Sequence, residues 1–140
     1  MRNRIALATA VALAVTVPVA CNPRPQTQLS GTATVTVNGN DAKFQLVNCT
    51  LVQWIRTVNI GSDFAGAKVV VDQRKEPITA ESVRIQNLGG FTGMYSQGDG
   101  GDASMSMSGD RFAITGTANG YKVDKPGEPA SATFKIIAEC

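Results

Sequence analysis

Residues 32–46 (TATVTVNGNDAKFQL) decide the fold class that this sequence predicts. Over the first six residues threonine alternates with alanine or valine, which is the two-residue period of a strand with one buried face. Asn38-Gly39 follows, a dipeptide that favours a tight hairpin turn because both residues tolerate a positive φ. Apolar side chains then recur at every second position, at Ala42, Phe44 and Leu46. The stretch therefore predicts two antiparallel strands joined by a short turn.

The same short-period pattern continues to the end of the sequence. Glycine-rich stretches separate the segments, and none of the segments shows a long period of 3.6 residues. We therefore expect one domain over residues 31–140 with an all-β fold, either an antiparallel β-sandwich or a partly open barrel. Further strands are expected at 52–60, 67–72, 81–88, 91–96, 103–108, 111–118 and 131–139.

Upstream of this domain, residues 1–20 have the pattern of an export signal. Residues 1–4 (MRNR) are basic, residues 5–20 are uncharged and largely apolar, and the small residue Ala20 ends the stretch. The uncharged stretch is shorter than the roughly 20 residues that a membrane-spanning helix needs. We therefore expect residues 1–20 to be a signal peptide that is removed during export.

The pair Ala20-Cys21 resembles the bacterial lipobox, in which small residues precede a cysteine. The thiol of Cys21 would take up a diacylglyceryl group, and cleavage after Ala20 would free the amine of Cys21 for a further acyl chain. Two or more acyl chains anchor a protein stably where one does not. Residues 21–30 would then be an acylated N-terminus with a tether that reaches at most about 30 Å. Pro18 stands where the lipobox usually has leucine, so ordinary secretion without lipid remains the alternative.

The number of cysteines favours lipidation over ordinary secretion. The chain has three cysteines, so one stays unpaired in an oxidising compartment. If Cys21 carries lipid, Cys49 and Cys140 remain as one possible disulfide. That disulfide would tie the last strand to the second.

Composition excludes several classes of function. Hydrophobic residues make up 43% of the chain and charged residues 17%, which is typical of a globular protein. Of the 13 basic residues, two lie in the leader, and the remaining 11 equal the 11 acidic residues, which argues against binding to nucleic acid. Histidine is missing from the sequence, which removes the commonest general base and metal ligand. We therefore expect a protein that is not an enzyme and holds no metal or cofactor.

Two segments could still be considered as metal sites. The loop at 98–102 (GDGGD) is acidic, but it lacks the ligand spacing of an EF-hand and is better interpreted as a tight hairpin turn. Met94, Met105 and Met107 carry soft thioethers that suit Cu(I). Their alternation with serine more simply predicts that Met105 and Met107 fill the core.

Aromatic and acidic residues provide two further candidates. Trp54, Tyr95 and Tyr121 could line a cavity for an apolar ligand, although core packing is the simpler interpretation for Trp54. An enzyme would need paired carboxylates, and a cleft that brings together Asp41, Asp63 and Glu81 would support one.

Several longer segments occur in the order found in one bacterial family. With this order and the two downstream cysteines, the chain resembles the mycobacterial LpqH-like lipoproteins, the nineteen-kilodalton lipoprotein antigen family. The segments are VNCT (47–50), TVNIG (57–61), Glu76-Pro77, SVRIQNLGGFTGMYSQGDGGDAS (82–104), FAITGTANG (112–120) and SATFKIIAEC (131–140).

This resemblance implies a β-rich domain anchored by lipid to the cell membrane and exposed on the extracytoplasmic side of a mycobacterial envelope. It further implies that Cys49 pairs with Cys140 and that Cys21 carries S-diacylglycerol and an N-acyl chain. Family members are surface antigens, and their acylated N-terminus engages the host Toll-like receptor 2. Some members carry a long glycosylated tether, whereas this chain has a short one.

Three functions remain open from the sequence. The first is a lipid-anchored envelope protein whose domain contacts cell-wall or host molecules. The second is a binding module that carries a small apolar or lipid ligand in an internal cavity. An enzyme that works through carboxylates ranks last.

Overall fold

The computed structural model describes residues 26–29 and 31–140, which form an all-β domain. Each pair of neighbouring strands in it is antiparallel. The strands are β1 (Gln26–Leu29), β2 (Ala33–Val37), β3 (Asn40–Phe44), β4 (Val47–Val52), β5 (Ile55–Gly61), β6 (Gly66–Asp72), β7 (Thr79–Leu88), β8 (Phe91–Ser96), β9 (Ala103–Ser108), β10 (Arg111–Lys122) and β11 (Lys125–Glu139).

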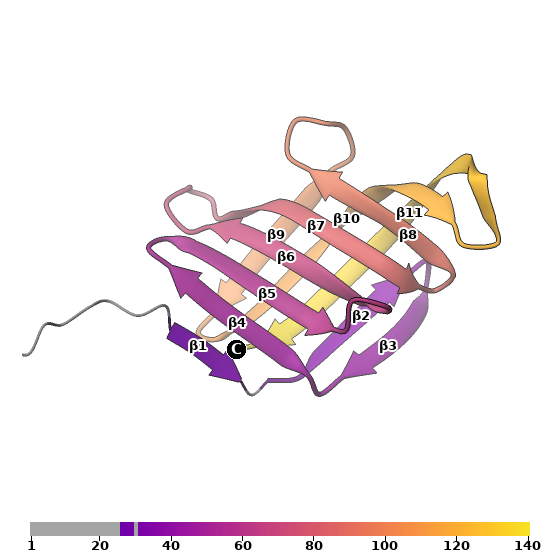
Figure 1. Ribbon diagram of the computed structural model, residues 1–140. Helices are drawn as coiled ribbons and strands as arrows, with labels where there is room; N and C mark the ends of the chain where they lie inside the picture. Colours follow the sequence, from indigo (N-terminus) through magenta and orange to yellow (C-terminus); the bar gives the residue numbers. More distant parts are fainter. Residues whose placement is uncertain (1–25, 30) are drawn as a thin grey trace, which may run out of the picture.

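The strands form one sheet that folds over on itself into a nearly closed barrel of two layers. Its order is β1-β4-β5-β6-β7-β8-β10-β11-β2-β3, with β9 on the free part of β10. Figure 1 shows β4 to β8 in the near layer, with β9, β10, β11 and β2 crossing behind them. This architecture confirms the all-β sandwich or partly open barrel expected from the alternating pattern.

The long strand β10 carries the sheet from one layer to the other. Its first half pairs with β9 and its second half, from residue 119, pairs with β8. Glycine is required at two positions of this strand, because a Cβ on Gly116 would collide with the carbonyl oxygen of Asp102 and one on Gly120 with that of Thr92. Glycine inside a strand commonly marks such a barrel corner.

The opposite side of the barrel is held by a covalent link. Cys49 of β4 and Cys140, which directly follows β11, form a disulfide with a Cα–Cα distance of 5.9 Å. The amide of Cys140 also donates a hydrogen bond of 2.9 Å to the carbonyl of Asp110. The disulfide expected from the cysteine count and the family resemblance is therefore present and joins the two layers.

The interior between the layers is filled by apolar side chains from alternate positions of both. This is the consequence of the two-residue period, since it directs every second side chain to the same face. The largest of the fully buried side chains are Phe91, Phe112, Ile60, Ile85, Ile114, Ile136, Val35, Val37, Val58, Val69, Val71 and Val83.

Three expectations about segments need correction. Residues 52–60 are not one strand, because a turn at Gln53 and Trp54, where Gln53 has a φ of 56°, separates β4 from β5. Residues 26–29, expected to be part of the tether, form β1 and pair with β4. The glycine-rich loop at 98–102 does not close a hairpin, since β8 and β9 both pair with β10 and not with each other.

The leader cannot be compared with the structure. Residues 1–20, Cys21 and the remaining tether residues 22–25 and 30 lie outside the described residues. Within the described part of the chain, no helix has the length and apolar character to cross a bilayer.

Candidate functional site

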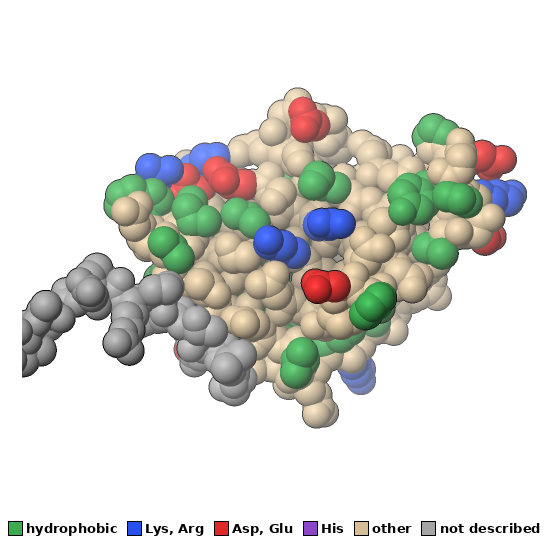
Figure 2. All heavy atoms as spheres, viewed as in Figure 1, with side chains coloured by type: hydrophobic (Ala, Val, Ile, Leu, Met, Phe, Trp, Pro, Cys, Tyr) green, Lys and Arg blue, Asp and Glu red, His purple; other side chains and the backbone are tan. Residues whose placement is uncertain are grey.

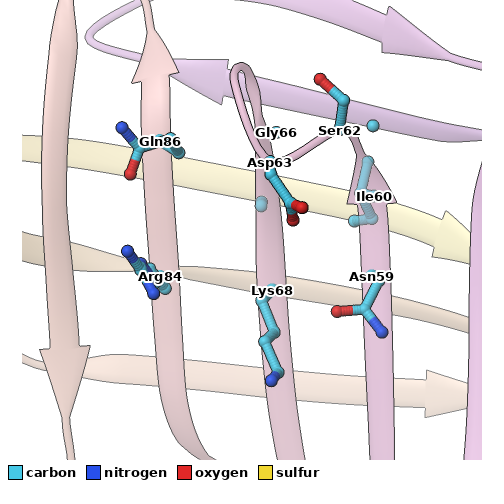
Figure 3. A pocket seen from close by; sticks show the side chains of 10 residues that line it. Asn59, Ile60, Ser62, Asp63, Gly66, Lys68, Arg84 and Gln86 are labelled. Carbon is cyan, nitrogen blue, oxygen red and sulfur yellow. The ribbon is translucent and has the colours of Figure 1, made fainter.

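A polar groove lies on the outer face of β5, β6 and β7, beside the loop that joins β5 to β6. Its volume is about 360 Å³. Asn59, Lys68 and Arg84 occupy one cross-strand row, because Asn59 pairs with Lys68 and Lys68 with Arg84. Figure 3 shows these three side chains in that row, with Asp63 extending from the loop above Lys68.

The two cations of the groove are placed directly opposite each other. Like charges in a cross-strand pair destabilise a sheet. Neither Lys68 nor Arg84 takes part in the ion pairs of the described residues, which join Arg74 to Asp72, Lys75 to Glu81 and Arg111 to Glu139. Two exposed cations beside amide groups can bind a carboxylate or phosphate oxygen, so this groove suits an anionic contact rather than a chemical step.

The three acidic residues that would have supported an enzyme do not come together. Asp63 lines the groove. Asp41 accepts a hydrogen bond of 2.6 Å from Thr36 on β2, and Glu81 of β7 pairs with Lys75 at 3.2 Å. Among the described residues no three acidic or cysteine side chains are grouped as metal ligands.

Trp54 is not a core residue, which corrects the interpretation from the sequence. It is 43% exposed at the tip of the β4–β5 hairpin, next to Val52, which is 53% exposed. The turn at Gln53 ends the strand before Trp54 can reach the interior. The guanidinium of Arg74 lies 4.8 Å from the centre of the indole ring, a cation–π contact from the β6–β7 loop.

Arg74 is itself held by a buried carboxylate. Asp72, at the end of β6, is only 3% exposed. It accepts hydrogen bonds from the Arg74 side chain at 3.0 and 2.6 Å and from the Arg74 backbone amide at 3.0 Å. Hydrogen bonds from the Arg74 side chain, then from its amide, lower the pKa of Asp72 from its usual 3.8 to about 2. The same pairing raises the pKa of Arg74.

The remaining sequence candidates are dispersed. Met105 and Met107 pack against the core as expected, whereas Met94 is 46% exposed, so the three thioethers do not gather. Tyr95 is buried and Tyr121 is 38% exposed, and with Trp54 at a hairpin tip the three rings line no common cavity.

The sequence could not predict that Lys68 and Arg84 form a cross-strand pair. The two residues are far apart along the chain and meet only through the register of β6 against β7. The available signal was that each is the single basic residue of its strand. Ala20 and Cys21, the cleavage and lipidation residues expected from the sequence, lie outside the described residues.

Comparison with known proteins identifies a family and several relatives. The family model of the Mycobacterium 19 kDa lipoprotein antigen matches residues 26–140, which includes all eleven strands of the described domain. A protein of Mycobacterium avium subsp. hominissuis named as a lipoprotein is 63% identical over 103 residues, covering 74% of this chain and 72% of the relative.

Two further relatives have similar names. A Mycobacterium indicus pranii protein, also named as a lipoprotein, is 61% identical over 103 residues, which are 74% of this chain and 74% of the relative. Lipoprotein LpqH of Mycobacterium tuberculosis is 33% identical over 95 residues, which are 67% of this chain and 59% of LpqH. The names of these relatives imply attachment to a membrane through lipid.

Proposed function

Because the chain belongs to the Mycobacterium 19 kDa lipoprotein antigen family, we propose that it is a lipid-anchored, non-enzymatic protein of the mycobacterial envelope. The observation that carries this proposal is the family match over the whole β domain, together with relatives that are named as lipoproteins. Cys21 carries the anchor as S-diacylglycerol cysteine with an N-acyl chain, after cleavage between Ala20 and Cys21. The domain then stands on the extracytoplasmic side of the cell membrane.

A role in contact rather than catalysis fits the side chains of the domain. The polar groove offers Lys68, Arg84 and Asp63 around amide groups, without a nucleophile activated by a neighbouring base. The relatives described above carry no enzyme name. The domain therefore acts as a surface antigen or interaction module.

The alternative of a carrier for a small apolar or lipid ligand requires space inside the barrel. Side chains such as Phe91, Phe112 and Ile114 occupy the interior between the two layers. The polar groove opens on the outer face of the sheet, as the labelled residues in Figure 3 show. An interaction role is therefore preferred.

Mass spectrometry of the protein purified from its own membranes tests the anchor. The expected result is an N-terminal peptide that begins at Cys21 and carries the mass of a diacylglyceryl group and an acyl chain. A peptide that begins at residue 21 without added mass would refute the proposal. Cys21→Ser gives an independent test, because membrane association should then be lost.

Recognition by the host forms the second part of the proposal. The acylated N-terminus, and not the β domain, engages Toll-like receptor 2. Reporter cells that express this receptor should respond to the acylated protein and not to the same protein carrying Cys21→Ser. An equal response to both forms would contradict this part.

A further inference from the structure

The first strand brings the chain to one particular end of the barrel. Gln26 of β1 pairs with Leu51 of β4, close to the β4–β5 hairpin tip, and Leu29 pairs with Asn48, farther from it. In Figure 1 the start of β1 lies on the left, below the β4–β5 hairpin and the β6–β7 loop. Only residues 22–25 separate Cys21 from Gln26, and these five steps along the chain span at most about 18 Å. An anchor on Cys21 therefore keeps this end close to the bilayer.

The same end exposes a tryptophan and a valine. Trp54 and Val52 flank the tip of the β4–β5 hairpin, and both are about half exposed. Figure 2 shows hydrophobic side chains at this left end, together with basic and acidic ones. Tryptophan favours the boundary between lipid headgroups and acyl chains, because its ring is apolar and its N–H remains hydrogen-bonded.

The charged side chains beside the hairpin tip and around the β6–β7 loop balance in number, since Arg56, Arg74 and Lys75 match Asp72, Glu76 and Glu81, although Arg56 takes part in none of the ion pairs of the described residues. Arg74, which covers the ring of Trp54, pairs with Asp72, and Lys75 pairs with Glu81. Because these charges sum to zero, the apolar tip, and not attraction to anionic lipid, provides the contact between the domain and the bilayer. The side chain of Arg74 remains 58% exposed and can still donate a hydrogen bond to a lipid phosphate.

A second exposed apolar residue lies at the end of the barrel away from the start of β1. Phe64, in the β5–β6 loop, is 86% exposed. It lies at the far end of β5, and a strand of this length separates it from Trp54 by about 20 Å. Since β1 leads to the Trp54 end, the anchor does not bring Phe64 to the same membrane.

We propose that the tip of the β4–β5 hairpin, formed by Val52 and Trp54 with Arg74 beside them, docks into the headgroup layer of the bilayer that holds the lipid on Cys21. This inference rests on the proposed function. It fixes the orientation of the domain: the loops around Asn38, Gly89 and Lys122, which line a second hollow, face away from the membrane.

Tryptophan fluorescence tests the contact directly, since Trp54 is the single tryptophan of the chain. The acylated protein is purified from its own membranes and reconstituted into phosphatidylcholine vesicles whose acyl chains are brominated near the headgroups. The expected result is a blue-shifted emission of Trp54 and a loss of roughly half of its intensity, because an interfacial indole lies close to the quencher.

The matched control moves the reporter to the other end. In the double variant Trp54→Phe with Phe64→Trp, both substituted positions are exposed, so the fold is expected to persist. The new tryptophan at position 64 should remain unquenched in the same vesicles. Equal quenching at positions 54 and 64 would show that the domain has no preferred orientation and would overturn the inference.

The result for the anchor is read separately by mass spectrometry of the same sample. Acylated protein whose Trp54 is not quenched would overturn the docking and leave the proposed function intact. Protein without lipid on Cys21 would overturn the proposed function and the docking with it. A third variant, Val52→Asp, should reduce the quenching of Trp54 at least about twofold, because a charge at the tip opposes insertion.

Discussion

Asp72 is the buried charged residue of the domain, and its burial is made possible by one neighbour. An ionised carboxylate away from water is unfavourable unless it is paired and hydrogen-bonded. Arg74, two positions after Asp72 in the chain, donates three hydrogen bonds to its carboxylate. The guanidinium of Arg74 also lies over the ring of Trp54. This small group therefore fixes the β6–β7 loop beside the hairpin that carries Trp54.

The lowered pKa of Asp72 predicts a pH dependence of stability. The folded protein holds this pKa at about 2, below the usual 3.8, so the ionised form stabilises the fold. This contribution is complete above pH 4 and is lost as the pH falls from about 4 to about 2. Asp72→Asn should therefore be less stable than the unmodified protein at neutral pH and about equally stable near pH 2.

Urea unfolding at several pH values measures this difference. Asp99→Asn, a substitution in the exposed β8–β9 loop, serves as the control and should leave the profile unchanged. A stability difference between Asp72→Asn and the unmodified protein that is the same at pH 2 and pH 7 would contradict the assignment.

Trp54 illustrates what alternation alone leaves undecided at the residue scale. It has the same parity along the chain as the buried residues Val58 and Ile60, so the pattern predicted an inward position. The deciding feature is Gln53, whose positive φ starts a turn that no glycine or proline signals. Since glutamine rarely adopts this conformation, the sequence contains no sign of the turn.

At the scale of elements, most strand positions and the β2–β3 hairpin were predicted correctly, and the partners of β8 and β9 on β10 were not. The bounds of β8 and β9 agree with the expected 91–96 and 103–108, because serine, glycine and aspartate bracket clear alternating segments. Their pairing with two halves of β10 depends on where β10 bends between the layers. The groove could not be predicted for the same reason, since Lys68 and Arg84 meet only through register.

The bend of β10 gives a prediction for one glycine. A Cβ on Gly120 would overlap the backbone of Thr92, which belongs to β8 and cannot move without breaking the sheet. Gly120→Ala should therefore destabilise the fold by about 1–3 kcal/mol, as overpacking does. Gly127→Ala is the matched control, because a Cβ on Gly127 meets nothing within 4 Å, and its effect should stay within about 0.5 kcal/mol.

Thermal unfolding of the two variants measures the difference. Equal melting temperatures for Gly120→Ala and Gly127→Ala would show that β8 and β10 can separate at this corner without loss of stability.

The cross-strand pair of Lys68 on β6 and Arg84 on β7 leads to a second prediction, on the stability of the sheet. Removing one of them by Arg84→Gln should raise stability by about 0.2–1 kcal/mol at low salt, because the unfavourable cross-strand pair is relieved. The gain should shrink as salt is added, since exposed charges are screened. Lys135→Gln, on an exposed position of β11, is the control and should show no such gain.

Urea unfolding at low and high salt measures both quantities. A loss of stability in Arg84→Gln at low salt would mean that Asp63 already neutralises the pair and that the groove is not electrostatically strained.

At the scale of the whole molecule, the barrel is a single sheet that is continuous on one side and open on the other. On one side β10 runs continuously between the layers, and on the other the edge strands β1 and β3 do not pair with each other. The family model matches from residue 26, the first residue of β1, so this edge strand lies within the matched region. The number of cysteines in the sequence pointed to Cys49 and Cys140 as a possible disulfide, although it could not show that this disulfide links the two layers at the open side of the barrel.

The Cys49–Cys140 disulfide should therefore contribute strongly to global stability. It closes a loop with a sequence separation of 91 residues. On a chain-entropy basis a loop of this length stabilises the folded state by about 4–5 kcal/mol. The double variant Cys49→Ala with Cys140→Ala should lose a large part of this in urea unfolding, while Cys21→Ser should unfold at the same urea concentration as the unmodified domain. A double variant as stable as the unmodified protein would mean that hydrogen bonds such as that from Cys140 to Asp110 hold the layers together without the covalent link.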